Sequence, residues 1–251
     1  HGATNQIYSN AEEFYRAENG HAIGYFWGFK TAGIFQNKQE INDWIAAGNG
    51  VYQSNVQPGD VKYVDVNGDG AIDANDKIDL GNGLPKYTFG FNLNLGYKGF
   101  DLSLNATGAA GFQIAQSYRD PNSSQSNYGR QILNRWTGEG TSNRIPRVTY
   151  GDVGNWQFSD LYLQDGDYIR LQNITLGYDF KRLISWKGLS KLRLYVQAQN
   201  LFTLTKYDGM DPEIGSFNGT DGNNNDTWVS GVDMGYYPHP RTFIVGINLA
   251  F

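Results

Sequence analysis

The chain has 251 residues, with 20 Lys or Arg against 25 Asp or Glu, and a formal net charge of −5. This balance excludes a basic nucleic-acid-binding domain, whose footprint is an excess of positive charge. The absence of cysteine excludes disulfide scaffolds, thiolate nucleophiles and cysteine-ligated metal sites. No run approaches the roughly 18 consecutive apolar residues of a transmembrane helix, so contact with a membrane would have to be made by strands.

Two features precede the main run of predicted strands. Gly24–Phe35 is rich in aromatic residues but alternates weakly, so it is a weaker strand candidate. Residues 65–76 match the twelve-residue calcium loop of EF-hands, with oxygen-bearing side chains at loop positions 1, 3, 5, 9 and 12. Gly70 supplies the sharp turn at position 6. The predicted ligands are Asp65, Asn67, Asp69, Ala71 through its carbonyl, Asp73 and Asp76.

This acidic loop predicts one structural Ca²⁺ bound by oxygen ligands only. Asp76 departs from the pattern, because an EF-hand has a bidentate Glu there, and the shorter side chain predicts weaker or altered coordination, as in dockerin-like loops. Four carboxylates in so short a loop would repel one another unless a cation neutralised them. The alternative is an Asx-rich turn without metal, since Asp, Asn and Gly are also common turn residues.

The clearest strand signal begins at Tyr87. Apolar or aromatic side chains alternate with small or polar ones through Tyr97, and the alternation resumes from Phe100 to Thr107 after the short turn Lys98-Gly99. A period of two is typical of a strand whose two faces meet different surroundings. The sequence therefore predicts a tight hairpin here.

Three further strands are predicted downstream. Tyr168–Phe180 is rich in strand formers but changes phase partway, which predicts a bulge near Asn173. Leu192–Thr203 alternates again, with apolar residues opposed by Arg, Gln and Thr, and so does the segment from Thr242 to Phe251. All the predicted regular structure is therefore β.

The connections between these strands are asymmetric. Those at 98–99 and 181–190 are short, whereas roughly 113–166 and 205–240 are long and rich in Gly, Asn, Asp and Ser. Strands of about 9–11 residues, short turns on one side and long loops on the other are typical of an outer-membrane β-barrel. The fold class predicted is all-β, a set of strands from a large antiparallel transmembrane barrel, with the polar face lining the lumen and the apolar face meeting lipid.

A secreted β-sandwich is the alternative fold, because its strands also alternate where one face meets the core and the other meets water. The polar faces of the predicted strands weigh against it. They carry mostly Asn, Gln, Thr, Gly and Ser with few Lys or Glu, which suits a crowded, wet lumen better than an open surface.

Catalytic chemistry is not predicted, and the chain is expected not to be an enzyme. The three histidines are far apart in sequence, at His1, His21 and His239. No nucleophile elbow, zinc-protease helix motif or phosphate loop is present in the sequence. Three tryptophans fall in long loops: Trp136, Trp156 and Trp228. They could stack on sugar rings or peptide side chains, but packing of the loops against one another is favoured.

Several segments, in the same order along the chain, resemble the SusC-like (SusC/RagA) TonB-dependent outer-membrane transporters. The similarity extends over most of the chain from about residue 20 and is to the C-terminal part of that family. The segments that carry it are Gly24–Phe35, Asn82–Tyr97, Tyr168–Tyr178, Leu194–Thr203, Asp211-Pro212-Glu213, Tyr237–Phe243 and Asn248–Phe251.

The resemblance implies an outer-membrane protein whose complete barrel has about 22 strands around an N-terminal plug. Residues 1–251 would be the C-terminal segment of that barrel, with the loop at 65–76 on the extracellular side. The plug, the TonB-contacting segment and the N-terminal strands are expected to be absent from this chain. The implied partners are the remainder of the barrel with its plug, outer-membrane lipid, a SusD-like lipoprotein, and TonB through the missing part; nucleic acid is not expected.

Two classes of function follow. The first is TonB-dependent import of oligomeric nutrients, with oligosaccharides as the expected substrate and oligopeptides as the alternative. The second is a secreted carbohydrate-binding β-sandwich with a calcium-stabilised loop. The loops carry no code that identifies substrate-binding residues, so none is predicted.

Overall fold

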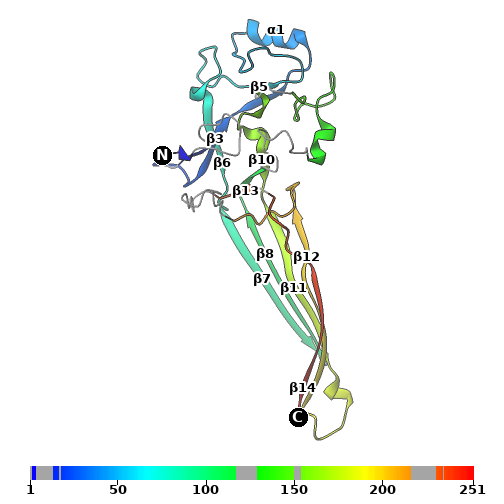
Figure 1. Ribbon diagram of the computed structural model, residues 1–251. Coiled ribbons are helices and arrows are strands. Elements are labelled where there is room, and N and C mark those ends of the chain that lie inside the picture. The colour runs from blue at the N-terminus through cyan, green and yellow to red at the C-terminus, as the bar shows by residue number, and fades with distance from the viewer. Residues whose placement is uncertain are drawn as a thin grey trace. The chain divides into compact units, whose positions relative to one another are not determined.

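The computed structural model describes residues 2–3, 14–16, 18–116, 129–149, 154–215, 230–233 and 235–251. Two compact units are present (Figure 1). The core unit comprises His1–Leu84, Gln113–Gln164 and Ile214–Gly235, and the sheet unit comprises Pro85–Phe112, Asp165–Glu213 and Tyr236–Phe251. Within the described ranges, no helix is long and apolar enough to cross a membrane.

The sheet unit is a five-stranded antiparallel sheet in the order β14-β12-β11-β8-β7. Its strands are β7 (Tyr87–Tyr97), β8 (Phe100–Ala110), β11 (Tyr168–Asp179), β12 (Lys191–Thr205) and β14 (Thr242–Ala250). Lys98 and Gly99 join β7 to β8 with φ of 47° and 95°. Positive φ at both residues is the requirement of a two-residue type I′ hairpin turn. The predicted hairpin, the all-β fold class and all the clear strand predictions are confirmed.

The strand register aligns the apolar side chains in rows across the sheet. Leu93 of β7 is paired with Leu104 of β8, and the row continues through Ile174, Ala198 and Phe243. The next row consists of Leu95, Leu102, Leu176, Val196 and Val245. Because side chains alternate between the faces of a strand, this register also places the polar residues together on the opposite face.

A bulge preserves this separation of the two faces. The register of β11 shifts between Leu171 and Asn173 against both β8 and β12. On β12 the corresponding irregularity includes Asn200, whose φ of 50° is unusual for a residue other than glycine. The phase change predicted near Asn173 is therefore a bulge, and it returns the apolar side chains of β11 to the common apolar face.

The apolar face of the sheet is left uncovered. Val245 keeps 81% of its surface exposed, and Phe91, Leu95, Ile247 and Leu204 are all exposed. A contiguous apolar surface of this kind marks contact with another apolar phase, because monomeric soluble proteins rarely leave one open to water.

The core unit is built from short strands and one α-helix. Its sheets are β1-β2-β3-β6, β4-β5 and β10-β9-β13. The strands are β1 (Gly2–Ala3), β2 (Tyr15–Arg16), β3 (Tyr25–Phe29), β4 (Thr31–Ile34), β5 (Val61–Tyr63), β6 (Lys77–Asn82), β9 (Gln113–Gln116), β10 (Leu163–Asp165) and β13 (Val232–Asp233). Helix α1 spans Lys38–Ala46, and Asn37 caps it by accepting from the backbone N–H of Glu40. The 3₁₀ helices of the two units are η1 (Ala74–Asp76), η2 (Arg130–Asn134), η3 (Gly154–Trp156), η4 (Asp160–Tyr162) and η5 (Phe180–Leu183).

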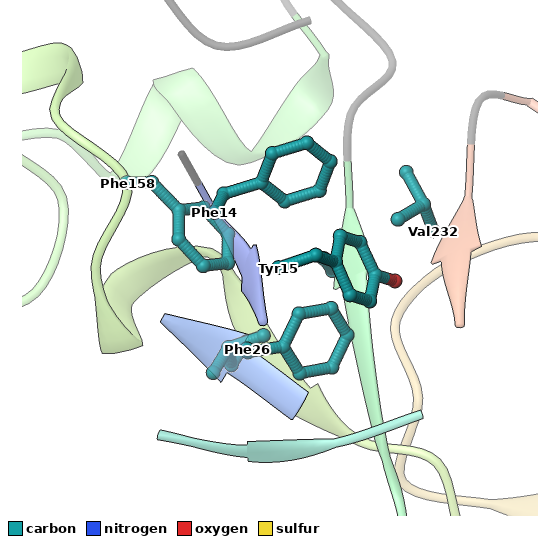
Figure 2. Packing of buried hydrophobic residues seen from close by; sticks show 7 residues of the cluster. Phe14, Tyr15, Phe26, Phe158 and Val232 are labelled. Carbon is teal, nitrogen blue, oxygen red and sulfur yellow. The ribbon is translucent and has the colours of Figure 1, made fainter. Parts of the chain in front are cut away.

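Aromatic side chains form the centre of the core unit. Figure 2 shows Phe14, Tyr15, Phe26 and Phe158 facing one another, with Val232 beside them. The Phe14 and Phe158 rings meet edge to face, with their centroids 5.5 Å apart. A second cluster consists of Phe29, Ile34, Val61, Tyr63 and Ile72.

The weak strand candidate Gly24–Phe35 belongs to this core and not to the long-stranded sheet. It forms β3 and β4, and Tyr25, Phe26 and Phe29 are all buried. Burial on both faces explains why the segment reads as an almost continuous aromatic run without clear alternation. The segment therefore supplies strands, as predicted, and these strands belong to the core unit.

Truncation of the aromatic core should destabilise the core unit. Phe26 is fully buried, so Phe26→Ala leaves a cavity, which costs about 3–5 kcal/mol in a protein core. We expect a marked loss of protease resistance in the complete protein, measured by limited proteolysis at increasing temperature. Ile23→Ala is the control, because Ile23 is 63% exposed and its loss should change little. Equal protease resistance of the two variants would contradict this account of the core.

Candidate functional site

The polar face of the sheet carries hydrogen-bonded pairs between neighbouring strands. Ser103 donates from Oγ to Asn94 Oδ1 at 2.7 Å, and Asn105 donates from Nδ2 to Asn92 Oδ1 at 2.5 Å. The pairs link β7 to β8 in successive polar rows. Amide and hydroxyl side chains of this kind can both donate and accept hydrogen bonds without introducing net charge.

One ion pair on this face reaches across a strand. Arg193 of β12 donates to Asp101 of β8 from Nε at 2.8 Å and from Nη2 at 2.5 Å, although β11 lies between the two strands. Gly177 of β11 makes this possible. A Cβ atom at Gly177 would lie 2.5 Å from Arg193 Nε and 2.6 Å from Asp101 Oδ1. The glycine therefore leaves the space through which the bidentate pair forms.

The second charged group on this face surrounds Arg170 of β11, which is only 2% exposed. Its Nε donates to Thr203 Oγ1 at 3.1 Å and its Nη1 donates to Glu213 Oε2 at 2.9 Å. Nη2 donates to Asp211 Oδ1. His239 Nδ1 lies 2.8 Å from Nη1 and 3.1 Å from Asp211 Oδ2. We call these four residues, Arg170, Asp211, Glu213 and His239, the Arg170 cluster.

The cluster joins three separate parts of the sheet unit. Asp211 and Glu213 follow β12, whereas His239 precedes β14. Burial alone would raise the pKa of Asp211, but hydrogen bonds from the backbone N–H of Glu213, from His239 and from Arg170 outweigh burial and lower the pKa. Asp211 is therefore ionised at neutral pH. It binds the buried guanidinium of Arg170 and the backbone N–H of His239, so the segment after β12 and the segment before β14 are both held at Arg170.

The geometry of the cluster favours an ion-pair network over a metal centre. Asp211, Glu213 and His239 place potential ligand atoms within 4.8 Å of one another. The guanidinium of Arg170 already donates to both carboxylates, so it supplies the positive charge that a cation would bring. In the sequence, Asp211-Pro212-Glu213 and Tyr237–Phe243 stand out only by their resemblance to the family, and no local pattern indicates the contacts that their side chains make.

The acidic loop predicted to bind calcium folds as a compact turn that begins after β5. Both Asp65 oxygens accept backbone N–H groups, from Gly68 at 2.6 Å and from Gly70 at 2.7 Å. Gly70 adopts φ of 83°, as the predicted sharp turn requires. Asp69 accepts from the N–H of Ala71 at 2.9 Å. Asp65, Asn67 and Asp69 are thus held in one turn with the Ala71 backbone, whereas Asp73 follows this turn and caps η1 by accepting from the N–H of Asn75 at 2.7 Å.

Asp76 closes this loop and is fully buried. Its Oδ1 accepts from the N–H of Val66 at 2.9 Å and its Oδ2 accepts from the N–H of Asp73 at 2.8 Å, forming a capping box. Among the residues that the structure describes, the loop carboxylates do not form a group of three with oxygens within 4.8 Å. The donor types fit a hard cation, and calcium binding stays a prediction.

Trp136 packs within the core unit. Its Nε1 donates to Gln36 Oε1 at 3.2 Å, and its ring contacts the cluster that contains Phe29 and Val61. This agrees with the packing role favoured from the sequence. Trp156 lies in η3, and Trp228 lies outside the described residues.

Several bacterial receptors are similar to this chain in sequence. TonB-dependent receptor P3 of Formosa agariphila is 33% identical over 234 residues, covering 92% of this chain and 22% of the relative. TonB-dependent receptor SusC of Bacteroides thetaiotaomicron is 29% identical over 204 residues, covering 80% of this chain and 18% of the relative. The chain thus spans about a fifth of the length of these relatives. No protein-family model matches the chain.

Solved structures of the same class share the fold. The structure titled RagAB peptide importer in the 'closed-closed' state matches with a TM-score of 0.63 and 22% identity, over 95% of this chain and 24% of that chain. The RagAB peptide transporter matches with a TM-score of 0.64 and 21% identity, over 94% of this chain and 24% of that chain.

These matches, together with the two-faced sheet of long strands, define the class: the chain is a segment of a TonB-dependent receptor. Within that class it belongs to the SusC-like receptors, and the resemblance found in the sequence is confirmed. The relatives are named as receptors, which confirms the prediction that the chain is not an enzyme.

The space above Gly177 should be required for the Arg193–Asp101 pair. We expect Gly177→Ala to displace the pair and to lower the heat resistance of the folded complete receptor, measured by its mobility shift in detergent gels. Gly90→Ala is the matched control, because a Cβ at Gly90 would meet only Ala106 O, at 4.0 Å. An equal effect of both substitutions would contradict the role assigned to this space, because only the Cβ at position 177 would meet the ion pair.

Proposed function

We propose that this chain forms part of the barrel wall and of the extracellular region of an outer-membrane transporter that imports oligomeric nutrients with energy from TonB. The observation that carries the proposal is the register of the five long strands, which gives one uncovered apolar face and one hydrogen-bonded polar face. Strands that alternate in this way cross a membrane with the apolar face toward lipid and the polar face toward the lumen. The relatives named TonB-dependent receptors support the same role.

The substrate proposed is an oligosaccharide, with an oligopeptide as the second candidate. The oligosaccharide is the substrate class that the resemblance of the sequence to the SusC-like transporters implies. The oligopeptide is favoured by the likeness to the RagAB structures, which are those of a peptide importer. The proposed partners are the rest of the barrel with its plug, a SusD-like lipoprotein, TonB and outer-membrane lipid.

The secreted β-sandwich considered from the sequence does not agree with the uncovered apolar face. A sandwich requires a second sheet packed on the apolar face of the first. The exposure of Val245, Phe91 and Leu95 argues against such a cover in the described chain. The sandwich also predicts a freely soluble monomer, whereas the barrel wall predicts a protein that needs detergent.

Fractionation followed by uptake measurements tests the function. The complete receptor should be recovered from outer membranes only with detergent, together with a lipoprotein partner. Deletion of its gene should abolish growth on one class of oligosaccharide and leave growth on the monosaccharide unchanged. Lost growth on oligopeptides alone would transfer the proposal to the second candidate, and recovery of a detergent-free soluble protein would contradict the transporter altogether.

We further propose that the acidic loop holds one structural Ca²⁺ through oxygens of Asp65, Asn67, Asp69, Asp73 and Asp76 and the Ala71 carbonyl. The ligand spacing and the turn at Gly70 support this. Ile72 packs into the second aromatic cluster of the core unit and fixes the middle of the loop. The ion would rigidify the loop and take no part in translocation.

Loss of two predicted ligands should abolish this binding. We expect Asp65→Ala with Asp69→Ala to remove one bound Ca²⁺ per chain, measured by elemental analysis after dialysis, and to raise protease sensitivity between residues 60 and 80 while the barrel still assembles. Asp43→Ala with Glu139→Ala removes two exposed carboxylates outside the loop and should retain the ion. If wild-type protein binds no calcium, the loop is an Asx-rich turn.

A further inference from the structure

His239 in the Arg170 cluster presents one ring nitrogen to two incompatible partners. Nδ1 lies 2.8 Å from Arg170 Nη1, which can only donate, and 3.1 Å from Asp211 Oδ2, which accepts when ionised. A ring nitrogen carries either a lone pair or a proton. In the neutral Nε2–H tautomer the lone pair on Nδ1 accepts from Arg170, whereas a proton on Nδ1, in the other neutral tautomer or in the cation, can be donated only to Asp211. The shorter contact is the one to Arg170, which always donates, and it selects the Nε2–H tautomer for neutral His239.

The charged groups around His239 keep a constant charge near neutral pH, so the protonation of His239 is what can change. The groups facing it are the Arg170 guanidinium from β11 and the Asp211 and Glu213 carboxylates after β12, while Thr203 of β12 is uncharged. Arginine stays protonated in proteins. The pKa of Asp211 is lowered despite burial, so this carboxylate stays ionised between pH 5 and 8. Histidine is the side chain that ordinarily changes charge in that interval.

We propose that His239 is a proton-operated contact, which joins the segment leading into β14 to Arg170 when neutral and to Asp211 alone when protonated. The His239 side chain is 51% exposed, so protons reach it from solvent. Protonation removes the acceptor and places an imidazolium 2.8 Å from the guanidinium, so like charges force the ring away from Arg170. The device goes beyond import itself and does not depend on which substrate is carried.

The contact controls the backbone that precedes β14. The His239 N–H donates to Asp211 Oδ2 at 3.2 Å, so a protonated Nδ1 shares this oxygen with the backbone and no longer contacts Arg170. Asn200 at the bulge donates from Nδ2 to Pro240 O at 3.2 Å and holds the neighbouring peptide. Release of the imidazole from Arg170 should therefore loosen residues 236–241, while the strand pairing of β14 with β12 stays intact.

Hydrogen exchange of the complete receptor in detergent micelles tests the proposal. After correction for intrinsic exchange chemistry, the peptide covering residues 236–241 should exchange about fivefold faster at pH 5.5 than at pH 7.5, the change expected for one ordinary hydrogen bond. His239→Asn places an amide oxygen near the position of Nδ1, where it accepts from Arg170 but takes up no proton. This variant should therefore show no pH-dependent difference.

His21→Asn is the matched control, because His21 also faces a carboxylate, with Nδ1 2.9 Å from Asp79 Oδ2, and lies in the core unit. It should keep the wild-type response of residues 236–241. A wild-type peptide whose corrected exchange does not change with pH would overturn the proposal. So would a response that persists in His239→Asn, or one that disappears equally in His21→Asn.

Discussion

The constraint on which the sheet unit depends is that every strand must keep apolar side chains on one face and polar side chains on the other. A slip of one residue in any strand would move its whole apolar set to the wrong face. The row from Leu93 to Phe243 shows that five strands from separate parts of the sequence satisfy this constraint together. The bulge between Leu171 and Asn173 is the local cost of satisfying it, because it lets β11 change phase and still present its apolar residues with its neighbours.

The same bulge separates two kinds of polar surface. On one side of it, amide and hydroxyl pairs and the Arg193–Asp101 pair connect adjacent and next-neighbour strands. On the other side, Arg170 binds the carboxylates of Asp211 and Glu213, which follow β12, and contacts the imidazole of His239, which precedes β14. A buried guanidinium is costly to leave unpaired. The need to pair Arg170 therefore fixes the positions of its partners Asp211 and Glu213. The polar side chains thus link the strands of the sheet to one another and also fix the segments after β12 and before β14.

The sequence predicted the features that depend on local periodicity. The alternation from Tyr87 to Tyr97 and the turn at Lys98-Gly99 were sufficient for the hairpin, and the phase change in β11 was sufficient for the bulge. The Arg170 cluster was beyond reach, because its partners lie 41, 43 and 69 residues away and no local pattern relates them. Apart from the strand candidate Gly24–Phe35 and the acidic loop, the elements of the core unit were not predicted, since its strands are short and its aromatic clusters join distant segments such as Tyr15 and Val232.

The central claim is that the two faces of the five-stranded sheet meet lipid and water respectively. The chain contains no cysteine, so single cysteines at Val245 on the apolar face and at Asn94 on the polar face report on each side without background from this segment. In intact outer membranes, a membrane-impermeant, water-soluble maleimide should label Asn94→Cys after access to the lumen, while Val245→Cys should react only with a lipid-soluble maleimide. Rapid labelling of Val245→Cys by the water-soluble reagent, at the rate seen for Asn94→Cys, would contradict the account.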